Sequence, residues 1–142
     1  MIPAQQLIDE ARKLIGTPWK HTGRTTRGVD CVGMVLLAAK NAGVDLTQYG
    51  VLDQAVYGRG AQPLLLEKVE QYCKRIADPV PGCLLFFRFY NDRHPKHFGI
   101  YTERDTMIHA DTKRGLVVEH GHRAHWKSQT HSCGLLPGVT YV

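Results

Sequence analysis

The sequence predicts an α+β fold in which helices come first along the chain and antiparallel strands follow. Two observations carry this prediction. Apolar residues in the first third recur at helical spacing or run almost unbroken, whereas short apolar segments separated by turns follow Pro81. The 142 residues match the size of one ordinary domain. We therefore expect a single domain over residues 1–142, with its helices packed on one face of the sheet.

The first helix is expected over residues 4–15, where apolar residues recur at i, i+3, i+4 and i+7. Pro3 suits the first turn of a helix, and Gly16 suits its end. A loop rich in Gly, Thr and Arg follows over residues 17–29. A second helix is expected over residues 31–43, and it should lie centrally because it is apolar almost all round.

The pattern changes from helices to strands in the second half of the chain. Residues 45–60 look irregular, and the spacing of apolar residues predicts a third helix over residues 65–76. A turn at Pro79 to Gly82 follows. Strands are then expected at residues 83–89, 97–103, 106–110 and 116–120, and near Leu135.

The chain carries a formal net charge of +5 and a pI near 9.1, which suggests an anionic partner or surface. Its basic residues are scattered and are not interleaved with aromatic residues, so we expect no nucleic-acid partner. The longest apolar run, Val32 to Ala39, is too short to span a bilayer, so no membrane partner is expected. Met1 to Pro3 lead directly into a charged amphipathic helix, so no signal peptide is expected.

The four cysteines are not spaced as a zinc ribbon or a thioredoxin-like motif. Cys73, Cys83 and Cys133 are interpreted as small buried apolar residues, and no disulfide framework is expected. Cys31 differs because it opens a helix, with Asp30 as the expected N-cap. The positive end of the helix macrodipole favours the thiolate, which is the nucleophilic form of cysteine.

Two histidines follow Cys31 at a distance in sequence, namely His97 and His109 on neighbouring predicted strands. The two strands can pair in different registers. If the numbers of facing residues add up to an even value near 206 to 208, the side chains of His97 and His109 lie on one face of the sheet within reach of each other. Gly99 between them indicates a close approach by another backbone, for which the start of the Cys31 helix is the candidate. A cysteine, a histidine and a second polar group form the pattern of a nucleophile, its base and an orienting residue. Taken singly, the same residues also fit a core thiol and two structural histidines.

Five segments carry a resemblance to a known family, in the expected order and at the expected spacing. They are residues 15–19, 28–35, 81–87, 97–101 and 107–110. In them the chain resembles the NlpC family of papain-like cell-wall peptidases, especially the short single-domain members carried by tailed bacteriophages. The resemblance covers about residues 4 to 120.

The resemblance implies a papain-like fold and a role for each matched residue. Cys31 would attack an amide carbonyl, His97 would carry the proton, and His109 would hold the His97 ring in one tautomer. The backbone N–H of Cys31 would stabilise the oxyanion. The implied substrate is the stem peptide of peptidoglycan, cut through a thioester between D-γ-glutamate and the following diamino acid. No cofactor is implied.

Two positions depart from the usual pattern of this family. Trp19 stands where tyrosine usually helps to line the substrate site, and an indole can donate a hydrogen bond but cannot accept one. Val32 stands where many bacterial members have serine, and an aliphatic residue is typical of the phage-like branch. We expect Trp19, Asp30 and His21 to be the substrate-binding residues.

His120, His122 and His125 form a cluster of histidines in the sequence. Imidazole suits zinc, nickel and copper, but no accompanying ligand pattern is present, so we expect solvated loop histidines and no metal.

The leading functional hypothesis is a peptidoglycan endopeptidase that is made in the bacterial cytoplasm and delivered to the cell wall in a phage tail. Its expected partners are the stem peptide and phage tail proteins. Two alternatives are a structural tail component with little turnover, and a related thiol amidase or acyltransferase.

Overall fold

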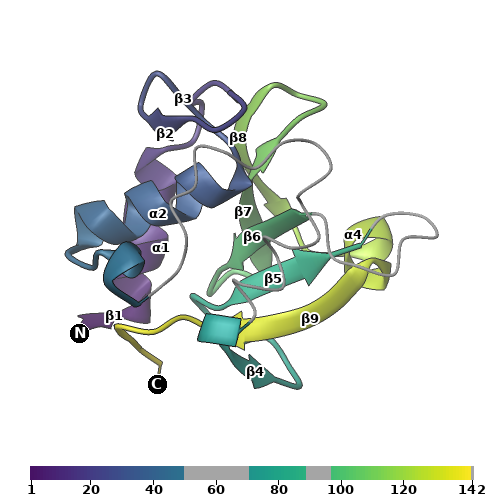
Figure 1. Cartoon of the computed structure of the whole chain (residues 1–142). Helices are drawn as coiled ribbons and strands as arrows, with labels where there is room; N and C mark the ends of the chain where they lie inside the picture. The colour runs from purple at the N-terminus through teal and green to yellow at the C-terminus, as the bar shows by residue number, and fades with distance from the viewer. Residues whose placement is uncertain (50–70, 89–96, 142) are drawn as a thin grey trace.

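The computed structural model describes residues 1–49, 71–88 and 97–141. Its main feature is a six-stranded antiparallel sheet with the strand order β4-β9-β5-β6-β7-β8 (Figure 1). The strands are β4 (Lys74–Ile76), β5 (Leu84–Phe87), β6 (His97–Tyr101), β7 (Thr106–Asp111), β8 (Leu116–Gly121) and β9 (Thr130–Leu135). The predicted α+β class is confirmed.

The two longer helices lie together on one side of this sheet (Figure 1). Helix α2 contacts α1 and also the strands β6 and β7, so it is the central helix that its apolar sequence predicted. The helical elements with described bounds are α1 (Ala4–Lys13), α2 (Cys31–Ala42), the 3-10 helix η1 (Leu46–Tyr49) and the short α4 (Ala124–Ser128), and residues 71–72 are also helical.

Strand β5 is buried on both faces, and this explains its unbroken apolar sequence. Leu84 and Phe86 belong to the core between the sheet and the helices. Leu85 and Phe87 belong to a second core on the opposite face, which also contains Cys83 and Cys133. Each such buried Leu or Phe side chain stabilises the fold by about 1.5–3 kcal/mol.

The cysteine interpretation is confirmed for Cys83 and Cys133, which are buried, whereas Cys73 is half-buried. All four cysteines are in the reduced, thiol form.

Two small strand pairs that the sequence did not predict complete the described residues. Strand β1 (Ile2–Pro3) pairs in parallel with β10 (Val139–Thr140), which holds the two ends of the chain side by side (Figure 1). Strand β2 (Arg24–Thr25) pairs with β3 (Gly28–Val29) in a small hairpin just before α2. This hairpin gives order to the predicted loop that leads into Cys31.

The third predicted helix is wrong over its last residues. Residues 74–76 form β4, where Ile76 pairs with Cys133 of β9, so pairing at the sheet edge overrides the helical spacing of the apolar residues. Residues 65–70 of that predicted helix, and residues 50–60 of the segment expected to be irregular, lie outside the described residues.

The other predicted elements are present with shorter or shifted ends. Helix α1 ends at Lys13 rather than residue 15, and β6 ends at Tyr101 because a turn begins at Thr102. Strand β8 confirms the strand predicted over residues 116–120 and extends one residue further, through Gly121. None of the helices among the described residues is long and apolar enough to cross a membrane.

Candidate active site

The start of α2 is held by the carboxylate of Asp30, as the sequence predicted. Asp30 has extended backbone angles, and its Oδ1 accepts a hydrogen bond from the Gly33 N–H at 2.8 Å, which is the geometry of an N-cap. The same carboxylate accepts from the Thr22 N–H at 3.0 Å and from Arg24 Nη1 at 2.9 Å. Asp30 is only 4% exposed, so its carboxylate is committed to joining the preceding loop to the helix.

A glycine contact fixes how closely this loop approaches the helix. A Cβ placed on Gly33 would lie 1.9 Å from the carbonyl oxygen of Gly23, so a side chain at position 33 would push the loop away. The chain therefore needs glycine where the loop crosses the first turn of α2.

The Cys31 thiol lies between the start of α2 and strand β6. The backbone N–H groups of Val32 and of Phe98 both hydrogen-bond to its sulfur, which places the thiol beside the residue that follows His97. Burial raises the pKa of the thiol to about 12, and the nearby charge of Asp30 raises it further, against the opposing effects of the two N–H groups. The prediction that the helix start favours the thiolate is therefore wrong for the thiol on its own, because burial outweighs the dipole.

The two histidines are in direct contact, with His97 Nε2 and His109 Nδ1 2.8 Å apart. Ile100 pairs with Ile108 across β6 and β7, so the numbers of facing residues add up to 208. This is the even register in which the two histidines share a face. The prediction that the two imidazoles share a face within reach of each other is confirmed.

Gly99 does mark a close approach, but its neighbour is not the one that the sequence suggested. A Cβ on Gly99 would lie 2.9 Å from the Ile108 carbonyl oxygen and 3.0 Å from the Cβ of His109. The close neighbour is thus strand β7 rather than the start of α2. Gly99 leaves the space in which the His109 side chain begins.

A third histidine, which the sequence analysis expected to be solvated, extends this contact. His120 lies on β8, and its Nε2 is 2.8 Å from His109 Nε2. Its other ring nitrogen, Nδ1, is 3.0 Å from the carbonyl oxygen of Gly121. The three imidazoles therefore form one hydrogen-bonded chain across three neighbouring strands, which we call the histidine chain (His97, His109 and His120).

Trp126, from the short helix α4, packs against every member of the histidine chain. Its ring centroid lies 4.8 Å from that of His109, 5.3 Å from that of His120 and 6.2 Å from that of His97. No sequence signal singled out this tryptophan, because α4 is too short to show a helical pattern.

Burial keeps the inner part of the histidine chain neutral at pH 7. It lowers the pKa of His97 to about 4, and it lowers the pKa of His109, which is fully buried, to about 2. The neighbouring imidazoles act in the same direction at both rings. With the Cys31 pKa raised as well, the resting site holds a neutral thiol and neutral imidazoles.

The histidines considered for a metal site have separate partners. His122 is buried and its Nε2 lies 2.8 Å from Thr130 Oγ1, while His125 is exposed on α4 and His120 belongs to the histidine chain. Within residues 1–49, 71–88 and 97–141, no three His, Cys, Asp or Glu side chains are grouped so as to hold a metal ion.

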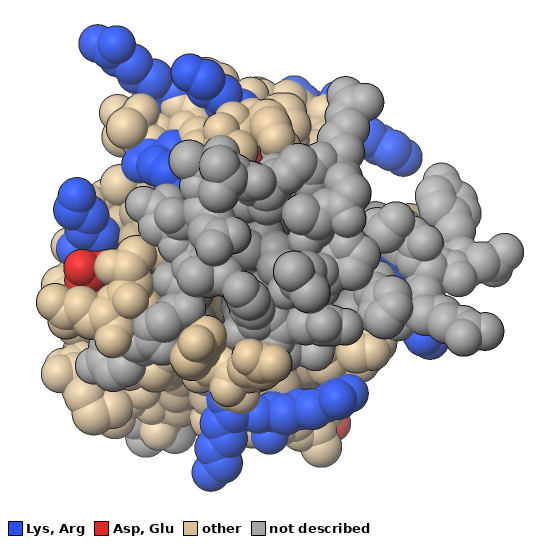
Figure 2. All heavy atoms as spheres, viewed as in Figure 1, with Lys and Arg blue, Asp and Glu red and all other residues tan. Residues whose placement is uncertain are grey.

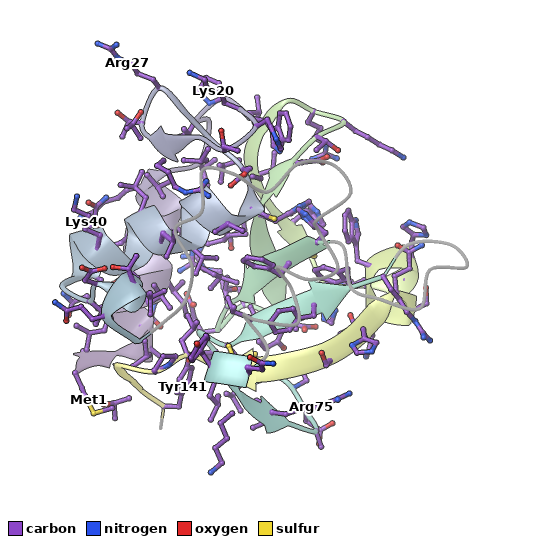
Figure 3. The ribbon with its side chains drawn as sticks, viewed as in Figure 1. Met1, Lys20, Arg27, Lys40, Arg75 and Tyr141 are labelled. Atoms are coloured by element: carbon purple, nitrogen blue, oxygen red, sulfur yellow. The ribbon has the colours of Figure 1, made fainter. Side chains whose placement is uncertain are left out.

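The predicted substrate-binding residues lie on and near the loop that precedes α2. Trp19 is half-buried, and its ring stacks on that of the exposed His21 with centroids 6.4 Å apart. Lys20 and Arg27 point outward from this part of the molecule (Figure 3). Binding of substrate by Trp19, His21 and Asp30 stays a prediction, and the Asp30 carboxylate already has three protein donors.

A cavity of about 380 Å³ lies beside the histidine chain and shares Trp126 with it. Its lining includes the basic residues Lys113 and Arg114 together with Asp111, whose charge acts on His97. On the face shown in Figure 2, lysine and arginine side chains occupy several separate places rather than one patch. Arg114 Nε lies 3.9 Å from Asp111 Oδ2, so Lys113 supplies the positive charge of the cavity that this carboxylate does not offset.

Comparison with known proteins identifies the family of this chain. The model of the NlpC/P60 family matches residues 16–134. The chain belongs to the NlpC/P60 family. It is 30% identical over 122 residues to the probable peptidoglycan endopeptidase LytE of Bacillus subtilis, a match that covers 86% of this chain and 31% of LytE. It is 28% identical over 121 residues to the probable endopeptidase NlpC of Escherichia coli, covering 85% of this chain and 70% of that protein.

The fold of this NlpC/P60 domain is that of solved family members. The crystal structure of the NlpC/p60 domain of the peptidoglycan hydrolase SagA superposes with a TM-score of 0.69 at 20% identity, covering 95% of this chain and 100% of that chain. The papain-like fold is thereby confirmed. This chain spans about a third of the length of LytE.

Proposed function

We propose that this NlpC/P60 domain is a cysteine peptidase that hydrolyses the stem peptides of peptidoglycan, between D-γ-glutamate and the following diamino acid. One observation carries the proposal. The Cys31 sulfur accepts a hydrogen bond from the backbone N–H of Phe98, the residue after His97, and His97 Nε2 lies 2.8 Å from His109 Nδ1, so Cys31, His97 and His109 lie together. The names of the related proteins LytE and NlpC support peptidoglycan as the substrate.

In the proposed reaction, the Cys31 sulfur attacks the amide carbonyl carbon while its proton passes to His97 Nδ1. The backbone N–H of Cys31 stabilises the oxyanion of the tetrahedral intermediate. His97 then gives the proton to the leaving amine, and a thioester remains on Cys31. Water attacks the thioester as His97 takes its proton, and the thiol is restored when the acid product leaves.

The electrostatics of the site determine when the thiolate exists. Burial disfavours a charged Cys31 and a charged His97 separately, because each pKa moves toward the neutral form. A thiolate is stable only while the adjacent imidazole holds its proton, since the two opposite charges then offset part of the desolvation cost. Proton transfer is therefore coupled to the attack on the substrate rather than completed before it.

The proposed substrate site joins the Trp19 loop to the cavity beside the histidine chain. Lys113 and Arg114 line that cavity, and their positive charge suits the carboxylates of a stem peptide. Trp19 and His21 would form the opposite wall, with the indole N–H as a donor. Trp19 in place of tyrosine leaves a thiol amidase or acyltransferase as an alternative, which product masses from a defined muropeptide distinguish.

We also propose that the protein reaches the cell wall as part of a phage tail, as the resemblance of the segment around Val32 to the phage-type branch implies. Purified tail particles should then contain this chain when probed with an antibody raised against it. Its absence from assembled tails would contradict this part of the proposal.

A second candidate function is a structural tail component with little turnover. The observation that favours it is the half-buried Cys31 thiol, whose pKa is raised to about 12 by desolvation. Labelling with iodoacetamide at pH 6.5 tests the resting thiol: rapid, selective labelling of Cys31 would contradict an inert thiol, whereas slow labelling is expected of the resting thiol in either function.

The decisive experiment is mass spectrometry of purified peptidoglycan after incubation with the wild type, Cys31→Ala and Cys73→Ala. Cys73 is a half-buried thiol that the mechanism does not use, so its variant is the matched control. New peptides ending in D-glutamate should appear with the wild type and the control but not with Cys31→Ala. Equal hydrolysis by Cys31→Ala would disprove the proposed mechanism, and no hydrolysis by any of the three would favour the structural role.

A further inference from the structure

The outer end of the histidine chain has only one possible hydrogen-bonding arrangement. The Gly121 carbonyl oxygen can accept a hydrogen bond but cannot donate one. His120 Nδ1, 3.0 Å away, must therefore carry the proton and donate it. In a neutral imidazole the other nitrogen is then an acceptor, so His120 Nε2 accepts.

The position of the proton on His120 determines the positions of the protons on His109 and then on His97. Because His120 Nε2 accepts, His109 Nε2 must be the donor across their 2.8 Å contact, and His109 Nδ1 is left as an acceptor. His97 Nε2 must then donate to His109 Nδ1, also at 2.8 Å. His97 Nδ1 is left without a proton, which is the state that a base facing the Cys31 thiol requires.

We propose that His120 is a positioning residue, which acts through His109 to hold His97 in the tautomer whose Nδ1 can accept the Cys31 proton. This inference rests on the proposed function for its catalytic consequence. Its structural content, the fixed set of three tautomers, stands on the hydrogen-bond geometry of three neutral imidazoles.

His109 cannot fix the tautomer of His97 without a further hydrogen-bond partner of its own. A neutral imidazole can present either a donor or an acceptor at Nδ1, and a donor there would force His97 to place its own proton on Nδ1. His97 would then hold a proton toward the thiol and could not act as a base. An acceptor-only group is needed somewhere along the chain, and the Gly121 carbonyl, reached through His120, supplies it.

The surroundings hold His120 in the required place. Trp126 packs on its ring, and the preceding residue, Glu119, is bound by Arg12 of α1 at 3.0 and 3.1 Å. Strand β8 is thus tied to the helix layer next to the histidine chain. Both contacts limit movement of the imidazole that would break its bonds to His109 and Gly121.

Two substitutions at one position test the proposal. In His120→Gln, the amide oxygen can accept from His109 Nε2–H at about the place of the imidazole nitrogen, whereas His120→Leu offers no acceptor. We expect kcat on a stem-peptide substrate to fall about 10- to 100-fold in His120→Leu, as is typical when a group that orients a functional histidine is lost. His120→Gln should retain most of kcat, and KM should change little in either variant.

The tautomers themselves are read by nitrogen-15 NMR of the ring nitrogens, without substrate. In the wild type we expect the proton on Nε2 of His97 and of His109 and on Nδ1 of His120. In His120→Leu the single tautomer at His97 should be lost, while backbone spectra report whether the fold persists, and His120→Gln should restore it.

Either of two results would overturn the proposal. One is a wild-type His97 that carries its proton on Nδ1, and the other is an unchanged His97 tautomer in His120→Leu. A failure of the proposed function looks different: the tautomers respond as expected, but no form of the protein cleaves peptidoglycan.

Discussion

Replacing Asp30 with alanine tests whether this carboxylate holds the catalytic helix or instead binds the substrate. Asp30 accepts from the backbone N–H groups of Gly33 and Thr22 and from the Arg24 guanidinium, at 2.8, 3.0 and 2.9 Å. At 4% exposure, water cannot replace these bonds without movement of the loop. Asp30→Ala therefore removes three interactions and leaves their donors without the acceptor.

The expected loss follows from these contacts. An N-cap is worth about 1 kcal/mol and hydrogen bonds to charged groups about 1.5–3 kcal/mol each, with some recovery as the loop relaxes. We expect a loss of about 3–5 kcal/mol in the free energy of unfolding, which is a large part of the total for a domain. Equilibrium unfolding in urea measures it as a lower midpoint with an unchanged slope.

Asp30→Asn is the matched control, because its amide oxygen still accepts from Gly33 while its amide nitrogen cannot accept from Thr22. Its loss in stability should therefore be smaller than that of Asp30→Ala. If Asp30→Ala changes the free energy of unfolding by less than about 1 kcal/mol, the reasoning from burial and bonding is refuted. A large fall in activity with unchanged stability would instead indicate direct substrate contact.

Two further predictions concern the histidine chain. Gly99→Ala should destabilise the protein by about 1–3 kcal/mol and lower activity, because the new Cβ meets the Ile108 carbonyl and the His109 Cβ. Gly121→Ala is the control, because its new Cβ meets only the flexible Arg123 side chain. Equal urea midpoints for the two variants would contradict this. The folded pKa values of His97 and His109, about 4 and about 2, lie below the unfolded value near 6.5, so the unfolded state binds more protons as pH falls. Below pH 6.5 the free energy of unfolding should therefore decrease by up to about 1.4 kcal/mol per pH unit for each of the two residues. Urea unfolding at pH 7, 6 and 5 should show a weaker dependence in His109→Gln; identical dependence would oppose this account.

The sequence predicted those parts of the site that depend on local chemistry. Asp30 as N-cap follows from its side chain and its place before an apolar helix, and the structure confirms it. Strand alternation allowed the contact between His97 and His109 in an even register, and the structure has that register. Both arguments need only a few neighbouring residues, so they hold without knowledge of the whole fold.

What the sequence missed depends on pairing between distant segments. Residues 74–76 have helical spacing, but they form β4 because the edge of β9 offers them partners nearly sixty residues away. His120 stands at the end of the strand predicted over residues 116–120, but it was expected to be solvated, so its contact with His109 was not foreseen. The raised pKa of Cys31 also depends on tertiary burial, which a helix-start pattern does not contain.

The position of the site at the meeting of helix and sheet accounts for its chemistry. The helix side presents the Cys31 sulfur and the Val32 N–H, and β6 presents the Phe98 N–H, so two donors face the sulfur. The sheet side supplies a base whose far nitrogen is held by the chain of hydrogen bonds that ends at the Gly121 carbonyl. Burial alone keeps both reacting groups neutral, but both donors stabilise the thiolate, and the histidine chain can stabilise the imidazolium. The site thus gains its reactivity from the charge-separated state that forms as the substrate is attacked, and it needs no free thiolate at rest.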